Sequence, residues 1–195
     1  MDKELNILDR FTIDFTNILK KHIDYVLVSG YVSILLGRSR SSEDVDLLVP
    51  PMDISDFEIL FNDLTEKGYE CANTSNLREA YNMLKDHAIR FYEGGIPLPN
   101  MEFKIINNEI HQYALDNKIR VVIGDNILFI SPIELQIAYK LYLMSDGDIM
   151  EMSSDKDFED AKHLYELFKE KIDSEKMLKF VSKFGVEQKW NFLKE

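Results

Sequence analysis

Two aspartates, Asp44 and Asp46, are separated by one residue at the start of an apolar run that continues to Val49. Side chains alternate between the two faces of a β-strand, so both carboxylates would share one face, roughly 6–7 Å apart along the strand. Like charges this close repel each other unless something neutralises them. Mg²⁺ does so well, because it favours one or two protein carboxylates and completes its shell with water and substrate phosphates. The pair therefore indicates an Mg²⁺ site, with Mn²⁺ as an alternative metal. The alternative interpretation is a plain strand start with two solvated acids.

The residues upstream of the aspartates suggest a phosphate site. A short apolar run ends at Ser29 and Gly30 and leads into a predicted helix over residues 31–36. The first turn of a helix binds phosphate through its free backbone N–H groups, above all after small residues. Arg38, Arg40 and Ser42 follow that helix. A phosphate turn, cations and a metal site within one short segment suit phosphoryl transfer, in which positioning and charge neutralisation supply most of the catalysis.

This segment resembles the signature of the nucleotidyltransferase superfamily, and most closely the minimal nucleotidyltransferases and the AbiEii-type toxins of toxin–antitoxin systems. In that signature a glycine-rich turn opens a helix, and a Gly-Arg-x-Arg-x-Thr-x-Asp-x-Asp segment follows. The matching residues here are Gly30, Arg38, Arg40, Ser42, Asp44 and Asp46. Ser29 stands where the family has its first glycine. The resemblance covers roughly residues 24–165 and implies a polymerase-beta-like nucleotidyltransferase fold.

The family uses a third carboxylate, usually Asp, on a neighbouring strand. The apolar run at residues 101–106 offers Glu102, and Glu93 is the second candidate. By resemblance, Glu102 would complete the metal site with Asp44 and Asp46, or would deprotonate the attacking hydroxyl. The alternative for Glu102 is an exposed acid that pairs with Lys104.

The resemblance also extends downstream. The residues Ser131, Pro132 and Glu134 predict a helix start, with the serine as N-cap and the proline in the first turn. Lys140 follows on that helix, and by resemblance it would join Ser29, Gly30, Arg38 and Ser42 in holding the nucleotide triphosphate. An ordinary surface lysine is the alternative. For Asp157 and Asp160 we expect helix capping or pairing with an arginine rather than metal binding.

The elements that must position these residues follow from hydrophobic periodicity and turn signals. Helices are predicted over residues 4–22, 31–36, 55–68 and 76–85, and strands over residues 25–28, 44–49, 88–93, 101–106, 119–123 and 127–130. Ser55 and Glu58 form a predicted capping box. Only helices are predicted after residue 130. The expected fold class is α+β, with a small mixed sheet and flanking helices in a catalytic core of residues 1–130. A helical portion, residues 131–195, would close over the nucleotide.

Composition narrows the class of protein further. The chain has 195 residues, of which 45% are hydrophobic, so it is long and apolar enough for a packed core. Its single cysteine, Cys71, excludes an intrachain disulfide and favours a reducing, cytoplasmic compartment. No run approaches the length of a membrane span, so we expect no membrane partner. The net charge of −12 argues weakly against broad nucleic-acid binding.

The sequence predicts an Mg²⁺-dependent transfer of a nucleoside monophosphate from an NTP to an acceptor hydroxyl. The acceptor stays open among a small molecule, a protein and an RNA end, and an antitoxin protein is a candidate partner by resemblance. One alternative is a non-catalytic nucleotide-binding or interaction protein that retains the fold. The substitutions at Ser29 and Glu102 favour it, and the retained Asp44 and Asp46 argue against it. A metal-dependent phosphodiesterase would need more metal ligands than the sequence offers.

Overall fold

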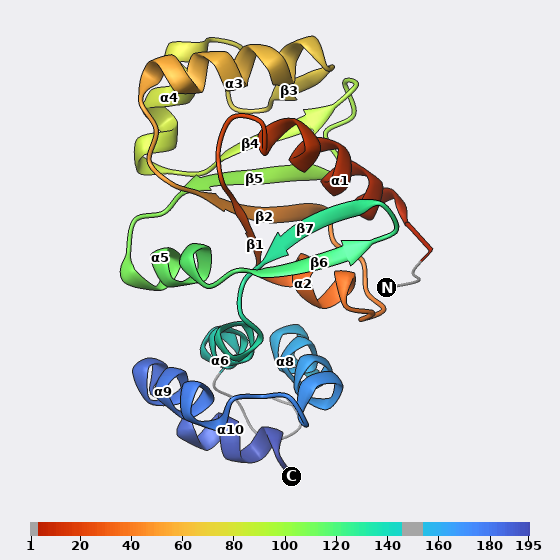
Figure 1. The fold of residues 1–195 in the computed structure, drawn as a ribbon, viewed down its shortest axis with the longest axis vertical. Coiled ribbons are helices and arrows are strands. Elements are labelled where there is room, and N and C mark those ends of the chain that lie inside the picture. The colour runs from red at the N-terminus through yellow and green to blue at the C-terminus, as the bar shows by residue number, and fades with distance from the viewer. Residues whose placement is uncertain (1–3, 146–153) are drawn as a thin grey trace.

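The computed structural model describes residues 4–145 and 154–195, and its central feature is a seven-stranded mixed sheet. The strands lie in the order β3-β4-β5-β2-β1-β7-β6 (Figure 1). Their bounds are β1 Val26–Val28, β2 Asp44–Val49, β3 Tyr69–Cys71, β4 Ile89–Glu93, β5 Asn100–Ile105, β6 Ile119–Ile123 and β7 Asn126–Ile130. The pairs β2–β5 and β1–β7 are parallel, and the other neighbouring pairs are antiparallel. The mixed sheet expected from the sequence is confirmed.

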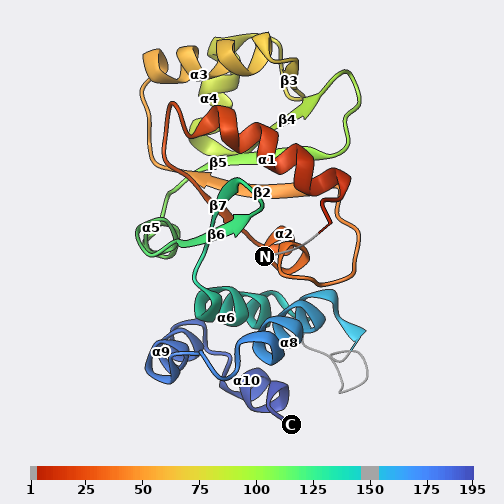
Figure 2. The same ribbon diagram turned by 45° about the vertical axis from the view of Figure 1, so that its right-hand side comes forward.

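Helices cover the sheet and form a separate layer beyond it. Their bounds are α1 Ile7–Leu19, α2 Gly30–Leu35, α3 Ile54–Glu66, α4 Leu77–Asp86, α5 Glu109–Asp116, α6 Ile133–Leu143, α8 Lys156–Phe168, α9 Ser174–Phe184 and α10 Glu187–Leu193. The last four pack on one another at the end of the molecule opposite to α3 and α4 (Figures 1 and 2). Within the described ranges, no helix is both long and apolar enough to cross a membrane.

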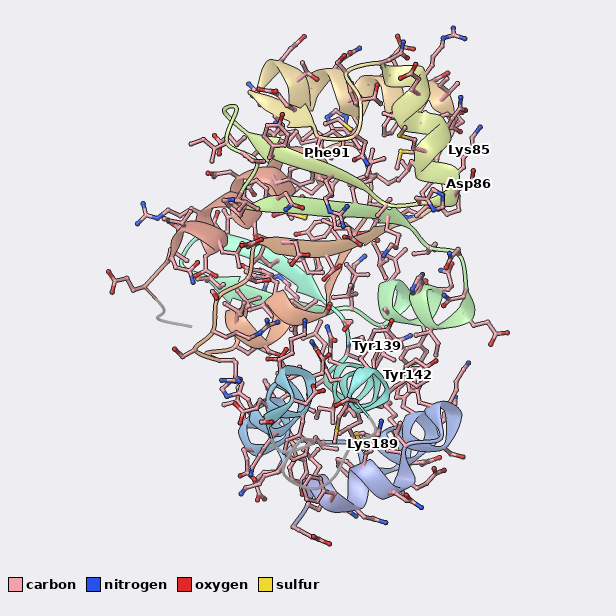
Figure 3. All side chains as sticks on the ribbon, turned by 180° about the vertical axis from the view of Figure 1, so that it is seen from behind. Lys85, Asp86, Phe91, Tyr139, Tyr142 and Lys189 are labelled. Atoms are coloured by element: carbon pink, nitrogen blue, oxygen red, sulfur yellow. The ribbon has the colours of Figure 1, made fainter. Side chains whose placement is uncertain are left out.

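The central strands divide their side chains between the core and the opposite face. On β2, Val45, Leu47 and Val49 are buried in the core, as the alternation predicts. Phe91 of β4, labelled in Figure 3, contacts the rings of Phe15 from α1 and Phe61 from α3. Helices α1 and α3 therefore cover this face of the sheet. The other face carries Asp44 and Asp46 and meets α5 and α6.

Two helix starts differ from the prediction, and two elements were not predicted. Helix α3 begins at Ile54, because the Asp53 carboxylate accepts hydrogen bonds from the N–H groups of Ser55 and Asp56, so the predicted capping box is wrong. The N-cap of α6 is Pro132, without a side-chain hydrogen bond, so Ser131 is not the cap. Strand β3 and helix α5 are too short to show a clear period.

Candidate active site

The sheet brings the first candidate residues together through the pairing of its central strands. Strands β2 and β5 run parallel, and Asp46 lies opposite Glu102 in their register. Such neighbours are about 4.8 Å apart across the strands. On the other side of β2, Asp46 pairs with Val28, the residue before Ser29. Asp46 and Glu102 therefore lie on adjacent strands, and Ser29 directly follows the end of β1 on the other side of β2. The neighbouring strand that the sequence analysis required for Glu102 is present.

The environment of Asp46 disfavours its negative charge, and a bound cation would offset this effect. Burial raises its pKa, and the negative charges of Glu102 and Asp44 raise it further. A hydrogen bond from Ser29 and the charge of Lys104 act in the opposite direction. The Ser42 hydroxyl lies 3.1 Å from Asp44 Oδ1 and 3.0 Å from the Asp44 carbonyl oxygen, so it holds the other carboxylate. Two oriented carboxylates with unfavourable mutual charge fit a divalent cation such as Mg²⁺.

The Glu102 carboxylate is held by cations on its own sheet. Arg90 Nη2 lies 2.5 Å from Glu102 Oε2, and Lys104 Nζ lies 3.1 Å from Glu102 Oε1. Over residues 4–145 and 154–195, no three Asp, Glu, His or Cys side chains are gathered around one metal position. The strand pairing thus supports Glu102 as the third carboxylate, whereas its ion pairs turn the side chain to Arg90 and Lys104. Its catalytic role stays a prediction. The pairing with Lys104 that we gave as the alternative is present.

The turn between β1 and α2 has a backbone that glycine would adopt more easily. Ser29 has φ 62° and ψ −141°, a region that side-chain-bearing residues rarely occupy. Gly30, the first residue of α2, lies under the Arg40 guanidinium, and a Cβ atom there would approach Arg40 Nη2 to 1.9 Å. A side chain at residue 30 would therefore displace the Arg40 guanidinium, and the conformation of Ser29 explains why glycine stands at that position in the family pattern.

Three cations predicted near the site meet one buried aspartate instead. We call this group the Asp160 cluster; it consists of Arg38, Arg40, Lys140, Asp157, Glu159 and Asp160. Asp160 is fully buried, and Lys140 Nζ lies 2.9 Å from its Oδ2 and Arg40 Nε 3.1 Å from its Oδ1. Arg38 Nη2 lies 2.6 Å from Glu159. The expected pairing of Asp160 with an arginine is present.

Lys140 does not reach the face that carries the metal carboxylates. Its ammonium group is buried and lies 2.5 Å from Asp157 Oδ1 as well as beside Asp160. The predicted contact with nucleotide phosphates therefore has no support in this arrangement, because an inward-facing lysine with two carboxylate partners is a structural ion pair. Arg38 is paired but partly exposed, with a side-chain exposure of 20%, so it retains access to solvent.

A cavity of about 140 Å³ opens beside Asp46 between the sheet, α5 and α6. Ser29 and Glu102 also border it, and α6 contributes Gln136 and Tyr139. Figure 3 labels Tyr139 on α6, at the junction between the sheet and the C-terminal helices. The sequence analysis singled out neither Gln136 nor His111, another lining residue. A signal for Gln136 was available, since it is one of few polar residues in the apolar helix α6.

Comparisons with known proteins identify the fold. No family model matches the chain, and no curated protein matches it by sequence. A crystal structure of an antigenic nucleotidyltransferase-like protein from Paracoccidioides brasiliensis matches with a TM-score of 0.54 and 16% identity, over 89% of this chain and 84% of that one. The crystal structure of ANT(2'')-Ia in complex with adenylyl-2''-tobramycin matches with a TM-score of 0.55 and 14% identity, over 91% and 94% of the two chains. The solution structure of the antibiotic-resistance factor ANT(2'')-Ia gives the same score and identity over 95% and 96%. The chain therefore has a nucleotidyltransferase-like α+β fold, as its sequence predicts.

Proposed function

We propose that this protein transfers a nucleoside monophosphate from an NTP to an acceptor hydroxyl. One observation carries the proposal: Asp46 lies opposite Glu102 in a parallel strand pair, with Asp44 on the same face and Ser29 at the adjoining strand end. The nucleotidyltransferase-like fold supports it, and the three candidate carboxylates Asp44, Asp46 and Glu102 belong to the adjacent central strands β2 and β5 of one sheet.

The reaction joins the acceptor oxygen to the α-phosphorus of the NTP. The bond from that phosphorus to the bridging oxygen of pyrophosphate breaks, and the hydroxyl proton goes to a carboxylate, for which Glu102 is the candidate. Asp44 and Asp46 would hold Mg²⁺, which supplies charge neutralisation for the triphosphate when bound. Ser42 fixes the Asp44 carboxylate for that task. Ser29, Gly30 and Arg38 are the proposed contacts of the triphosphate.

The test is release of pyrophosphate from each NTP with Mg²⁺ or Mn²⁺ and with chelator, together with calorimetric binding of a non-hydrolysable NTP. Asp44→Asn should abolish transfer and weaken metal-dependent binding, and Glu102→Gln should abolish transfer while largely sparing binding. Glu43→Gln is a matched control: Glu43 is an exposed acid beside Asp44, and its backbone carbonyl accepts hydrogen bonds from Asn100 that do not depend on its side chain. Equal activity of Asp44→Asn and Glu43→Gln would contradict the proposal.

A non-catalytic nucleotide-binding protein is the second candidate. The observation that favours it is the pairing of Glu102 with Arg90 and Lys104. These ion pairs engage both oxygens of the carboxylate that catalysis would need. If the protein is non-catalytic, it should bind NTP in a metal-dependent way and release no pyrophosphate with any acceptor tested. Release that depends on Asp44 would exclude it.

The acceptor class and a toxin role are further parts of the proposal. ANT(2'')-Ia is described with an adenylylated tobramycin, so one fold neighbour modifies a small molecule. The net charge of −12 also favours a small molecule or a protein over RNA. If the resemblance to AbiEii-type toxins extends to function, expression should slow growth in the wild type but not in Asp44→Asn, and co-expression of a neighbouring antitoxin should restore it.

A further inference from the structure

The cavity beside Asp46 has the size of a single ring. Its volume is about 140 Å³. An engineered protein cavity of about 150 Å³ with apolar walls binds one benzene molecule, which gives the scale. Leu48 from β2, Ala114 from α5 and Leu135 from α6 line it, and all three are buried. A group that enters this space is therefore compact and largely apolar.

The charged side chains that line the cavity already have partners or an assigned role. The charged residues of the lining are Asp46, Glu102 and Lys104. Glu102 is already engaged by Arg90 and Lys104, and Asp46 belongs to the proposed metal site. An ammonium group in the cavity would have to compete with these partners for a carboxylate, and leaving it unpaired against the apolar side chains is costly. The cavity thus selects against polycationic molecules.

Two buried nitrogen atoms in the lining have no hydrogen-bond partner among the described residues. Gln136 is only 2% exposed, and its Nε2 atom donates to nothing in the described parts of the chain; the same holds for Nδ1 of His111. Burial and the charge of Lys104 lower the pKa of His111, which favours its neutral imidazole. A buried amide without a partner is expensive, and native structures rarely retain one without a use. Gln136 therefore marks a place for a ligand atom that accepts a hydrogen bond.

We propose that this cavity is the acceptor subsite and that the acceptor is an uncharged, single-ring compound with a hydroxyl group and a hydrogen-bond acceptor on the ring. The inference rests on the proposed nucleotidyl transfer. The ring would lie between Ala114 and Leu135 and would accept a hydrogen bond from Gln136 Nε2, while its hydroxyl faces Asp46 and Glu102. Because these carboxylates border the cavity, an occupant presents its hydroxyl where transfer would take place.

Ligand-observed NMR with two matched probes tests the subsite without any chemistry. The probes are 4-pyridinemethanol, whose ring nitrogen accepts a hydrogen bond, and benzyl alcohol, which has the same shape without that acceptor. At mildly alkaline pH both the pyridine and the imidazole are uncharged. The wild type should bind 4-pyridinemethanol about fivefold more tightly than benzyl alcohol, the effect of one neutral hydrogen bond.

Two variants place that binding in the cavity. Gln136→Met keeps the side-chain volume and removes the unpartnered amide, so the protein should stay folded and the preference between the probes should vanish. Ala114→Leu fills the cavity and should weaken both probes by about tenfold. Equal probe affinities in the wild type, or an unchanged preference in Gln136→Met, would overturn the inference even if Ala114→Leu failed to fold.

Competition separates the acceptor subsite from other uses of the cavity. Probe binding should persist with a saturating non-hydrolysable ATP analogue and Mg²⁺, and tobramycin should not displace it. Displacement by adenosine or uridine would make the cavity a nucleobase subsite, and displacement by tobramycin would make it a cation site; either overturns the inference. Asp44→Asn should retain probe binding. Its loss of transfer tests the proposed function separately, so intact probe binding without transfer in the wild type would count against the proposed function alone.

Discussion

Replacing Asp160 by asparagine is expected to destabilise the protein by about 3–5 kcal/mol, the usual cost of breaking a buried ion pair by removing one partner. Asp160 is fully buried, and Arg40 and Lys140 both lie within 3.1 Å of its oxygens. In the Asp160 cluster three cations face three carboxylates, so the group is neutral as it stands. Asparagine keeps the shape and leaves one positive charge uncompensated beside a fully buried position.

The assay is thermal unfolding at neutral pH with Glu159→Gln as the matched control. Glu159 contacts Arg38 at 2.6 Å in the same cluster, but its side chain is 46% exposed. An exposed pair contributes at most about 1 kcal/mol. For a chain of this length, 1 kcal/mol corresponds to about 2–4 °C, so the Tm of Asp160→Asn should fall by roughly 6–20 °C and that of the control by only a few degrees.

A double variant tests the cause of the loss. Adding Lys140→Met to Asp160→Asn removes one uncompensated cation, so it should recover part of the stability. NTP binding by Lys140→Met alone should change little once the protein is kept below its Tm, since Lys140 is buried away from the carboxylate face. Equal Tm values for Asp160→Asn and Glu159→Gln would refute the account of a buried electrostatic junction.

Three further changes test the site. Asp46→Asn should raise the Tm at neutral pH while abolishing transfer. Burial and the charges of Glu102 and Asp44 raise the pKa of Asp46, so the folded state loses stability as pH rises through that pKa. An unchanged or lower Tm would contradict this explanation. Ser29→Gly should stabilise the protein by about 1 kcal/mol, because Ser29 has φ 62° and ψ −141°; a loss in denaturant unfolding would show that its hydrogen bond to Asp46 outweighs the strain. In the wild type the free energy of unfolding should fall below about pH 6.5, because the pKa of His111 is lowered in the folded state and the unfolded chain takes up the proton first. His111→Gln should make this fall smaller. Parallel profiles of unfolding free energy against pH for the wild type and the variant would exclude this effect.

The parts of the fold that the sequence predicts are those with a strong local signal. Strand β2 has the predicted bounds Asp44–Val49, because alternation and the two following prolines define it locally. The hairpin of β6 and β7 follows from its central glycine turn, Gly124 having a positive φ. Strand β3, with only three residues, owes its existence to pairing with β4, which no local pattern reveals.

The site also contains features that the sequence predicts and features that depend on tertiary packing. The adjacency of Asp46 and Glu102 could be predicted from alternation and from the family pattern of neighbouring strands. The environment of Lys140 could not, because its partners Asp157 and Asp160 lie 17 and 20 residues further along the chain and reach it only when α8 packs on α6. The ion pair between Arg90 and Glu102 likewise forms only because β4 pairs with β5.

The Asp160 cluster also has a consequence for how such a protein can change during evolution. Arg38 and Arg40 belong to the segment that leads to the metal carboxylates, whereas their acids come from α8. A recombination that exchanged the C-terminal helices for those of a relative without these acids would leave two arginines uncompensated beside Ser42 and Asp44. The two parts must therefore be inherited as a matched pair, and a fragment that ends at residue 130 would lose the geometry of the loop before the carboxylates.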